Sequence, residues 1–273
     1  MSGWQLQDLP NPARGLGDWF RVMWRGLALG TLTYVCLCVL LLVRLLERPL
    51  FGMNRPWSPY ITQFVCRSAF LILGIGYSTR GTPMQQPGAI VANHGSWLDV
   101  FTLNAAQRVY FVSKSEVAGW PGIGWLARAT GTLFIARKGT EAKVQQELFE
   151  ARLRAGHRLL FFPEGTSTDA VRVLPFKSTL FAAFFTHGLE HVLHIQPVTV
   201  VYHAPDGEDP RFYGWWGEMD FAGSLLKMLA TRNHGRVEVI FHAPVPVDGF
   251  ADRKVLAAYC ERVIRTSHPY APA

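Results

Sequence analysis

From residue 82 onward, short runs rich in Val, Ile and Phe alternate with helical patterns, and this alternation narrows the possible folds sharply. An amphipathic stretch at 139–156 is the clearest of the helical patterns. The apolar runs predict strands near 89–93, 109–112, 132–136, 158–162, 195–201 and 236–242. Strands that alternate with helices are usually joined by right-handed crossovers. The sequence therefore predicts an α/β fold, with a mainly parallel or mixed sheet flanked by helices.

The N-terminal part of the chain is apolar enough to enter a membrane. Residues 26–43 carry no charge and would extend about 27 Å as a helix, close to the roughly 30 Å of a hydrocarbon core. A second apolar stretch, at 60–77, is interrupted by Arg67. A spanning helix and a two-helix hairpin within one leaflet both fit this pattern. We expect residues 1–80 to form a membrane-associated helical segment and residues 81–273 to form the α/β domain.

Composition and charge favour a protein that acts at a membrane, but they do not identify its binding partner. The 273 residues suit one catalytic-sized domain, and 49% are hydrophobic while only 17% are charged. The net charge of +7 suits anionic lipid head groups or an acidic carrier protein, but it would suit nucleic acid equally well. Arginines are balanced at the two ends of the apolar segment, so they do not predict its orientation.

Metal sites and disulfides are not expected. The four cysteines form no CxxC pair and have no histidine at ligand spacing; they lie at positions 36, 38, 66 and 260. His187, Glu190 and His191 lie at helix-compatible intervals but lack the HExxH order. We therefore expect no bound metal.

Polar side chains follow several of the predicted strands. These strand-end residues are Asn93 with His94, Arg137, Glu164 with Gly165 and Thr166, and His203. The carboxyl ends of parallel strands meet at one edge of a sheet, where such folds place their chemistry. A base, a cation and a carboxylate that converge there would form a site.

The spacing of His94 and Asp99 in "NHGSWLD" is compatible with a catalytic pair. Five residues within one helix would place the two side chains about 140° apart, so we expect His94 in the turn and Asp99 in the first helical turn. From there the carboxylate can reach back to the imidazole and fix its tautomer. The alternative is a capping box from Ser96 to Asp99, in which Asp99 only stabilises the start of the helix.

Four sequence blocks resemble those of the glycerolipid acyltransferases, of the lysophosphatidate acyltransferase type. "NHGSWLD" resembles their HxxxxD signature, and "GTLFIAR" resembles the second block. "FFPEGTS" with "LPFK" resembles the third, and "IQPVTV" the fourth, in the same order. The resemblance implies transfer of an acyl chain from acyl-carrier protein or acyl-CoA to a lysolipid hydroxyl. It implies membrane lipids as partners, and neither a metal, another cofactor, a covalent acyl-enzyme nor nucleic acid.

The resemblance also implies roles for single residues. His94 would be the general base and Asp99 its orienting partner. The residues expected to bind the acceptor head group are Arg137, Glu164, Gly165 and Thr166. Lys177 would meet anionic charge or line the surface, and the sequence leaves both open. The family implies a membrane location, at the bacterial inner membrane with the site on the cytoplasmic face.

One departure from the family pattern concerns the acceptor. Members that acylate phosphate-bearing acceptors commonly carry an arginine after the EGT, whereas this chain has Ser167 there and Arg172 only later. This resembles the branch that O-acylates lyso-ornithine lipids, whose acceptor bears a carboxylate and an amine and carries its hydroxyl on an amide-linked fatty acid. Asp169 is a candidate to meet that amine. The departure favours lyso-ornithine lipid slightly over 1-acyl-glycerol-3-phosphate.

A rival from another class is a non-catalytic, membrane-tethered lipid-binding protein with the same fold. The presence of His94, Asp99 and Glu164 argues against it. A serine hydrolase is also disfavoured, because no G-x-S-x-G elbow occurs in the sequence.

Overall fold

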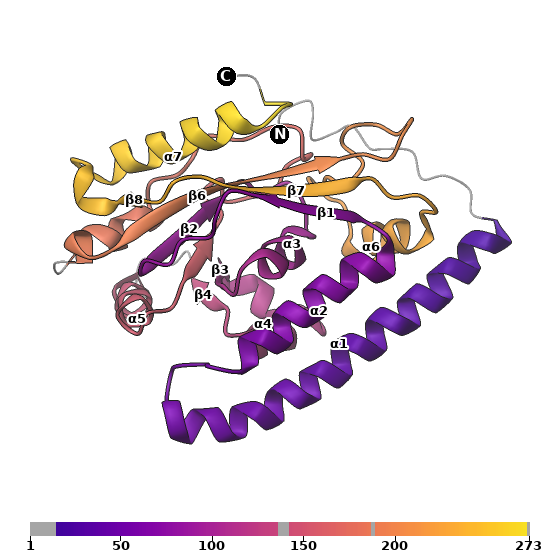
Figure 1. Cartoon of the computed structure of the whole chain (residues 1–273), viewed down its shortest axis with the longest axis horizontal. Helices are drawn as coiled ribbons and strands as arrows, with labels where there is room; N and C mark the ends of the chain where they lie inside the picture. The colour runs from indigo at the N-terminus through magenta and orange to yellow at the C-terminus, as the bar shows by residue number, and fades with distance from the viewer. Residues whose placement is uncertain (1–14, 136–141, 187–188, 272–273) are drawn as a thin grey trace.

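A mixed eight-stranded sheet forms the centre of the molecule, as the computed structural model shows for residues 15–135, 142–186 and 189–271 (Figure 1). The strand order is β1-β7-β6-β2-β5-β3-β4, and β8 pairs with β6. All pairs are parallel except those of β6 with β7 and β8. The bounds are β1 Gly76–Arg80, β2 Gly88–Ala92, β3 Tyr110–Lys114, β4 Leu133–Ile135, β5 Leu159–Phe161, β6 His194–His203, β7 Arg236–Phe241 and β8 Val245–Pro246. The six predicted strands are all present, and the sheet is mixed.

Strand β1 was not predicted, and it lies on the N-terminal side of the expected division at residue 80. Its residues pair in parallel with β7, from Gly76 opposite Arg236 to Arg80 opposite Ile240. It is an edge strand whose side chains are mostly exposed, so it lacks the apolar run that marks the central strands. The sheet therefore begins before the predicted boundary.

Helices cover both faces of the sheet (Figure 1). Because side chains alternate along a strand, Ile90 of β2 packs into the core formed with α2, α3 and α6, whereas Val91 packs into the core formed with α5 and α7. The bounds of these helices are α2 Ser58–Leu73, α3 Asp99–Ala106, α5 Ala142–Arg154, α6 Phe221–Ala230 and α7 Arg253–Ser267. Helix α4, Ile123–Thr130, lies on the side of α2 and α3.

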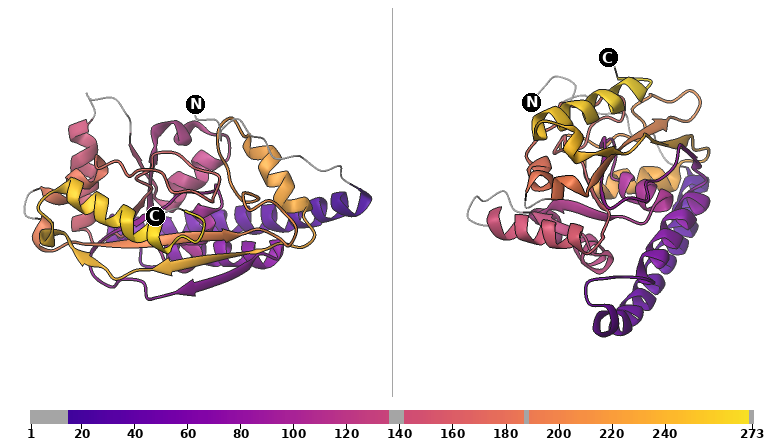
Figure 2. Two further views of the ribbon diagram at one scale, coloured as in Figure 1. Left: turned by 90° about the horizontal axis from the view of Figure 1, so that it is seen from above. Right: turned by 60° about the vertical axis from the view of Figure 1, so that its left-hand side comes forward.

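Helices α1 (Leu16–Phe51) and α2 form an antiparallel hairpin along one side of the molecule (Figure 2). Helix α1 has 36 residues, which corresponds to about 54 Å. It is the one helix in the described ranges that is long and apolar enough to cross a membrane, and only 6% of its apolar window is buried. The first predicted apolar stretch is therefore helical throughout, the second is helical up to Leu73 and ends in β1, and the long helix exposes most of its side chains.

Arginines of the hairpin region bind the C-terminal ends of three helices in the α/β domain. The last carbonyls of a helix lack intrahelical partners and lie at the negative end of its dipole, so guanidinium groups stabilise them. The contacts are Arg67 with Ala105 of α3, Arg55 with Ala129 of α4, and Arg21 and Arg25 with Ala230 and Leu229 of α6. Both ends of the hairpin are thus attached to the same domain. These four arginines therefore serve internal contacts.

Candidate active site

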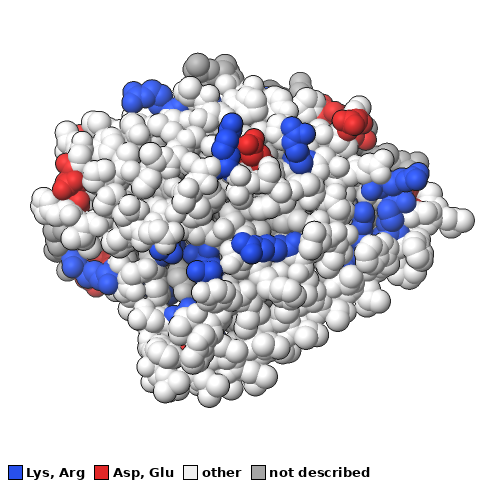
Figure 3. Space-filling view, in the orientation of Figure 1, with Lys and Arg blue, Asp and Glu red and all other residues white. Residues whose placement is uncertain are grey.

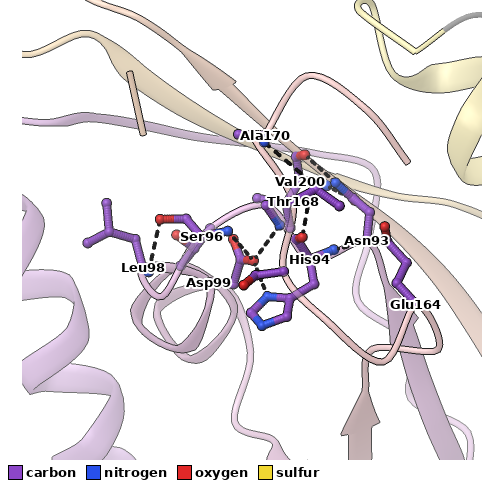
Figure 4. A network of polar contacts seen from close by, with 12 residues as sticks. Asn93, His94, Ser96, Leu98, Asp99, Glu164, Thr168, Ala170 and Val200 are labelled. Atoms are coloured by element: carbon purple, nitrogen blue, oxygen red, sulfur yellow. Dashed lines mark hydrogen bonds and ion pairs between the residues drawn. The ribbon is translucent and has the colours of Figure 1, made fainter. Parts of the chain in front are cut away.

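His94 and Asp99 are in contact where β2 passes into α3 (Figure 4). The distance from His94 Nδ1 to Asp99 Oδ2 is 2.7 Å. Helix α3 begins at Asp99, as predicted, and His94 lies in the preceding turn. The Asp99 side chain is fully buried, whereas the His94 side chain is 19% exposed. The carboxylate is thus shielded from water while the imidazole remains accessible.

Asp99 makes both of the contacts that the sequence left as alternatives. Its Oδ2 accepts hydrogen bonds from the backbone N–H groups of Gly95 and Ser96, at 2.9 and 3.0 Å. The Ser96 contact is one half of a capping box, while the Ser96 hydroxyl accepts from Leu98 instead. The same oxygen therefore stabilises the turn and contacts the imidazole of His94.

The second carboxylate oxygen of Asp99 contacts Tyr202, which the sequence reasoning missed. The Tyr202 hydroxyl lies 2.6 Å from Asp99 Oδ1 and 3.0 Å from the Thr102 hydroxyl. Burial, together with the negative charge of Asp99, raises the pKa of Tyr202 well above its ordinary value, so the phenol stays protonated and donates. Both oxygens of Asp99 are consequently held by hydrogen-bond donors.

The tautomer of His94 follows from these contacts. Asp99 accepts the Nδ1 proton, so Nε2 carries the lone pair in the neutral ring. Within the described part of the chain, Nε2 has no hydrogen-bond partner. The ring stacks on Phe162, with 4.1 Å between ring centroids and 10° between the planes. Phe162 thereby fixes the ring orientation, and Nε2 is available to take a proton.

The Glu164 side chain is buried and contacts the backbone of the His94 turn. Its Oε1 accepts from the backbone N–H of His94 and its Oε2 from that of Leu174, both at 2.7 Å. The residue is only 2% exposed. Burial, together with the smaller effect of the negative charge of Asp99, raises the pKa of this carboxyl to about 8, although the two N–H groups oppose the shift. The carboxyl therefore connects the third sequence block to the His94 turn.

The loop after Glu164 is closely fitted to its neighbours. Gly165 has φ +74°, and a Cβ there would lie 2.9 Å from Lys177 Nζ. Lys177 is exposed, and its backbone N–H donates to Pro163. Thr166 is exposed beside it. Gly165, Thr166 and the Lys177 ammonium are thus brought together at the surface.

A second loop segment supports the His94 turn from the other side. The backbone N–H of Thr168 donates to the carbonyl oxygen of His94 at 2.9 Å. A Cβ on Gly95 would lie 2.9 Å from the Cα of Ala170, so this close approach requires glycine. Figure 4 shows Thr168 and Ala170 directly beside the turn. The loop that follows the third sequence block therefore supports the turn of the first block through backbone contacts.

Three predicted placements differ from the structure or lie outside it. Asp169 is buried and forms an ion pair with Arg172 at 2.9 Å, so its carboxylate is not free for an amine. His203 lies beside Tyr270, at 3.3 Å, because β6 extends beyond the site before it ends. Arg137 lies outside the described residues. No cluster of three or more metal-binding side chains is present among the described residues.

His94 lines an apolar cavity of about 330 Å³, which we call the active-site cavity. Its walls come from α1, α2, α3, α4 and the sheet, and Leu40, Val65, Phe111 and Leu126 are among them. A cavity of this kind accepts an alkyl chain, because its lining offers few hydrogen-bond partners. The imidazole of His94 therefore lies at the wall of a cavity that can accept an alkyl chain.

Comparisons with known proteins identify the family. A protein-family profile described as Acyltransferase matches residues 77–201. The chain is 60% identical, over 95% of its length and 93% of the relative's length, to a lyso-ornithine lipid O-acyltransferase of Rhodobacter capsulatus. The chain belongs to the acyltransferase family. His94, Asp99 and Glu164 lie within the matched region, and this acyltransferase acts on lipid substrates.

Two further comparisons place this acyltransferase among its relatives. It is 33% identical to a 1-acyl-sn-glycerol-3-phosphate acyltransferase of Neisseria gonorrhoeae, over 45% of this chain and 49% of the relative. The crystal structure of the 1-acyl-sn-glycerophosphate acyltransferase PlsC from Thermotoga maritima matches with a TM-score of 0.57. That match covers 89% of this chain and 95% of the other at 21% identity, and it shows a shared fold.

Proposed function

We propose that this enzyme transfers a fatty acyl chain from an acyl-carrier protein or acyl-CoA thioester to the hydroxyl of lyso-ornithine lipid. The observation that carries acyl transfer is the 2.7 Å contact between His94 and Asp99 at the wall of an apolar cavity. The 60% identity to an enzyme named for lyso-ornithine lipid supports the acceptor.

In the proposed mechanism, His94 acts as a general base. Its Nε2 takes the proton of the acceptor hydroxyl while the oxygen attacks the thioester carbonyl carbon. Asp99 stabilises the imidazolium that forms, since its carboxylate already accepts the Nδ1 proton. The tetrahedral intermediate then expels the thiolate, which takes the proton from Nε2. An ester and a free thiol result, and the enzyme returns to its starting state without a covalent acyl-enzyme.

The proposed acceptor site is the loop that contains Gly165, Thr166 and Lys177. The Lys177 ammonium would meet the carboxylate of the ornithine head group. Arg172 is engaged by Asp169, and Ser167 replaces the arginine of phosphate-binding relatives, which disfavours a phosphate at this loop. Glu164 acts by holding the His94 turn, because both of its oxygens already accept backbone N–H groups. Arg137 remains a candidate for the same head group.

The proposed location is the cytoplasmic face of the bacterial inner membrane, with the α1–α2 hairpin in one leaflet. Arg21 and Arg25 near the start of α1, and Arg55 after its end, all bind the α/β domain. A helix attached to one domain at both ends lies along that domain, so it is not placed to cross a bilayer. Figure 3 shows the hairpin surface nearly free of charge, with a row of Lys and Arg along its border. Such a border suits anionic lipid head groups.

The test is acylation by the purified protein in vesicles. Lyso-ornithine lipid and 1-acyl-glycerol-3-phosphate are offered in parallel, each with acyl-carrier protein and acyl-CoA donors. We expect ornithine lipid as the main product, and loss of acylation by at least about 10²-fold in His94→Ala. His94→Ala should bind vesicles as the wild type does.

Each outcome bears on a different part of the proposal. Acylation of 1-acyl-glycerol-3-phosphate alone would overturn the acceptor but not the chemistry. Full activity in His94→Ala would overturn the base mechanism. Binding of lyso-ornithine lipid without turnover by the wild type would favour the non-catalytic lipid-binding protein.

A further inference from the structure

A second apolar cavity, of about 320 Å³, lies under the hairpin beside the active-site cavity. It is enclosed by α1 and α2 on one side and by α3, α4 and α6 on the other. Residues that line this second cavity but not the active-site cavity include Gly30, Ala69, Leu73, Leu225 and Leu229. The described site and its mechanism make no use of this space.

The two cavities follow one another along α1. The second cavity is lined by α1 residues from Gly26 to Tyr34, and the active-site cavity by residues from Thr33 to Leu40. Six residues line both cavities and form the wall between them: Thr33, Trp97, Phe101, Ile123, Leu126 and Phe221. Trp97 is held in place because its indole N–H donates to Ser224 at 2.9 Å. Apart from Thr33, the shared wall consists of large apolar side chains, and one of them, Trp97, lies three residues after His94 in the chain.

The reaction needs room for two alkyl chains at one point. This step rests on the proposed function, in which the acceptor hydroxyl belongs to an amide-linked fatty acid whose tail continues beyond it. When that hydroxyl meets the thioester carbonyl at His94, the acyl chain and the acceptor tail both start there. The carrier of the thioester is water-soluble and stays outside, so the acyl chain runs inward into the cavity that His94 lines. The acceptor tail then requires a separate apolar space.

We propose that the second cavity binds the alkyl tail of the acceptor, while the active-site cavity binds the acyl chain under transfer. Trp97 and Phe101 in the shared wall keep the two chains apart. Each methylene that leaves water for such a space strengthens binding about fourfold. The length of the acceptor tail and the length of the donor chain are consequently selected by different residues of the same hairpin.

Gly30→Leu tests this assignment. A Cβ at Gly30 meets no atom within 4 Å, so a leucine there projects into open space. Leucine is also a better helix former than glycine, so the variant should fold. The assay measures kcat/KM for lyso-ornithine lipids with amide-linked chains of increasing length at one donor, and for donors of increasing length at one acceptor. We expect about a tenfold loss for long acceptor tails, little change for short ones, and an unchanged donor profile.

Cys36→Phe is the matched control on the same helix, because Cys36 lines only the active-site cavity. It should shift the donor preference to shorter chains and leave the acceptor profile unchanged. A changed donor profile in Gly30→Leu, or unchanged profiles for both substrates in this variant, would overturn the assignment. If the wild type acylates only 1-acyl-glycerol-3-phosphate, the proposed acceptor fails. The same length series with that lipid then tests the cavity separately.

Discussion

The Tyr202 hydroxyl donates a 2.6 Å hydrogen bond to Oδ1 of Asp99, the carboxylate oxygen that His94 does not use. Tyr202 comes from β6 and Asp99 from the start of α3, so 103 residues separate them in the chain. The bond holds the carboxylate in one rotation, with Oδ2 towards the imidazole. Tyr202 therefore acts as a positioning residue for the His94–Asp99 pair.

Tyr202→Phe should lower kcat about tenfold, because a hydrogen bond to a buried charge is lost. The KM for the acceptor should stay nearly unchanged, because Tyr202 contacts Asp99 and Thr102. Tyr213→Phe is the control, since it removes another buried hydroxyl, one that contacts His234 and Gly235. An equal fall of kcat in the control, or no fall in Tyr202→Phe, would count against the positioning role.

Asp99→Asn should lower activity by at least about 10²-fold while the melting temperature changes little. The asparagine oxygen can still accept from the turn, and its amide can donate to Tyr202, so the shape of the site is kept. The charge that stabilises the imidazolium is lost. Asp220→Asn is the control, because Asp220 caps α6 by accepting from Gly223. If Asp99→Asn stays as active as that control, Asp99 is only a cap.

Glu164 should make stability depend on pH. Its pKa in the folded protein is about 8, above the ordinary 4.5, so the folded state holds the proton more tightly. This stabilisation is complete below about pH 4.5 and is lost as pH rises to about 8, at up to about 1.4 kcal/mol per pH unit. Chemical denaturation in detergent from pH 5 to 8 measures it for the wild type and Glu164→Gln.

The glutamine variant does not titrate, and its amide leaves one backbone N–H without an acceptor. The wild type should therefore be more stable at pH 5, and the difference in unfolding free energy should narrow towards pH 8. Glu261→Gln is the control, since it also removes an acceptor of a backbone N–H. A difference between the wild type and Glu164→Gln that stays constant with pH would contradict the expected ionisation.

Arg55→Ala should destabilise the protein by about 1–3 kcal/mol, because the carbonyl of Ala129 at the end of α4 loses its donor. The melting temperature in detergent measures this effect. Arg48→Ala is the matched control, because Arg48 is an exposed residue near the same end of the hairpin. Equal effects of the two substitutions would mean that the contact with α4 is not important.

Charges on the outer face of α1 should weaken membrane binding without harming the site. Leu42 and Leu46 are 64% and 61% exposed, so Leu42→Glu with Leu46→Glu disrupts no core packing. We expect vesicle binding to fall at least about tenfold, since glutamate side chains resist transfer into lipid. Val255→Glu on α7 provides the control at an exposed apolar residue outside the hairpin. Loss of binding in Val255→Glu to the same extent would argue against a hairpin within the leaflet.

The local sequence was enough to determine the alternating strands and helices, the two apolar helices, and the position of His94 before the first turn of α3. These features depend on side-chain periodicity and on contacts between near neighbours, which a sequence displays directly. The contact of His94 with Asp99 was one of two arrangements that the spacing allowed, and in the structure one carboxylate oxygen makes this contact and also accepts from the Ser96 N–H.

Only the tertiary structure decided which groups complete the site. Tyr202 was missed and its neighbour His203 was chosen, because which face of β6 meets α3 depends on the packing of the sheet. The Glu164 carboxyl accepts hydrogen bonds from two backbone N–H groups, and Asp169 forms an ion pair with Arg172. Strand β1 pairs with β7 at the edge of the sheet. Each of these contacts joins segments through packing or backbone hydrogen bonds whose partners no local pattern specifies. Local sequence therefore predicted the helices, most of the strands and the proximity of His94 to Asp99, and long-range packing determined how that pair is held.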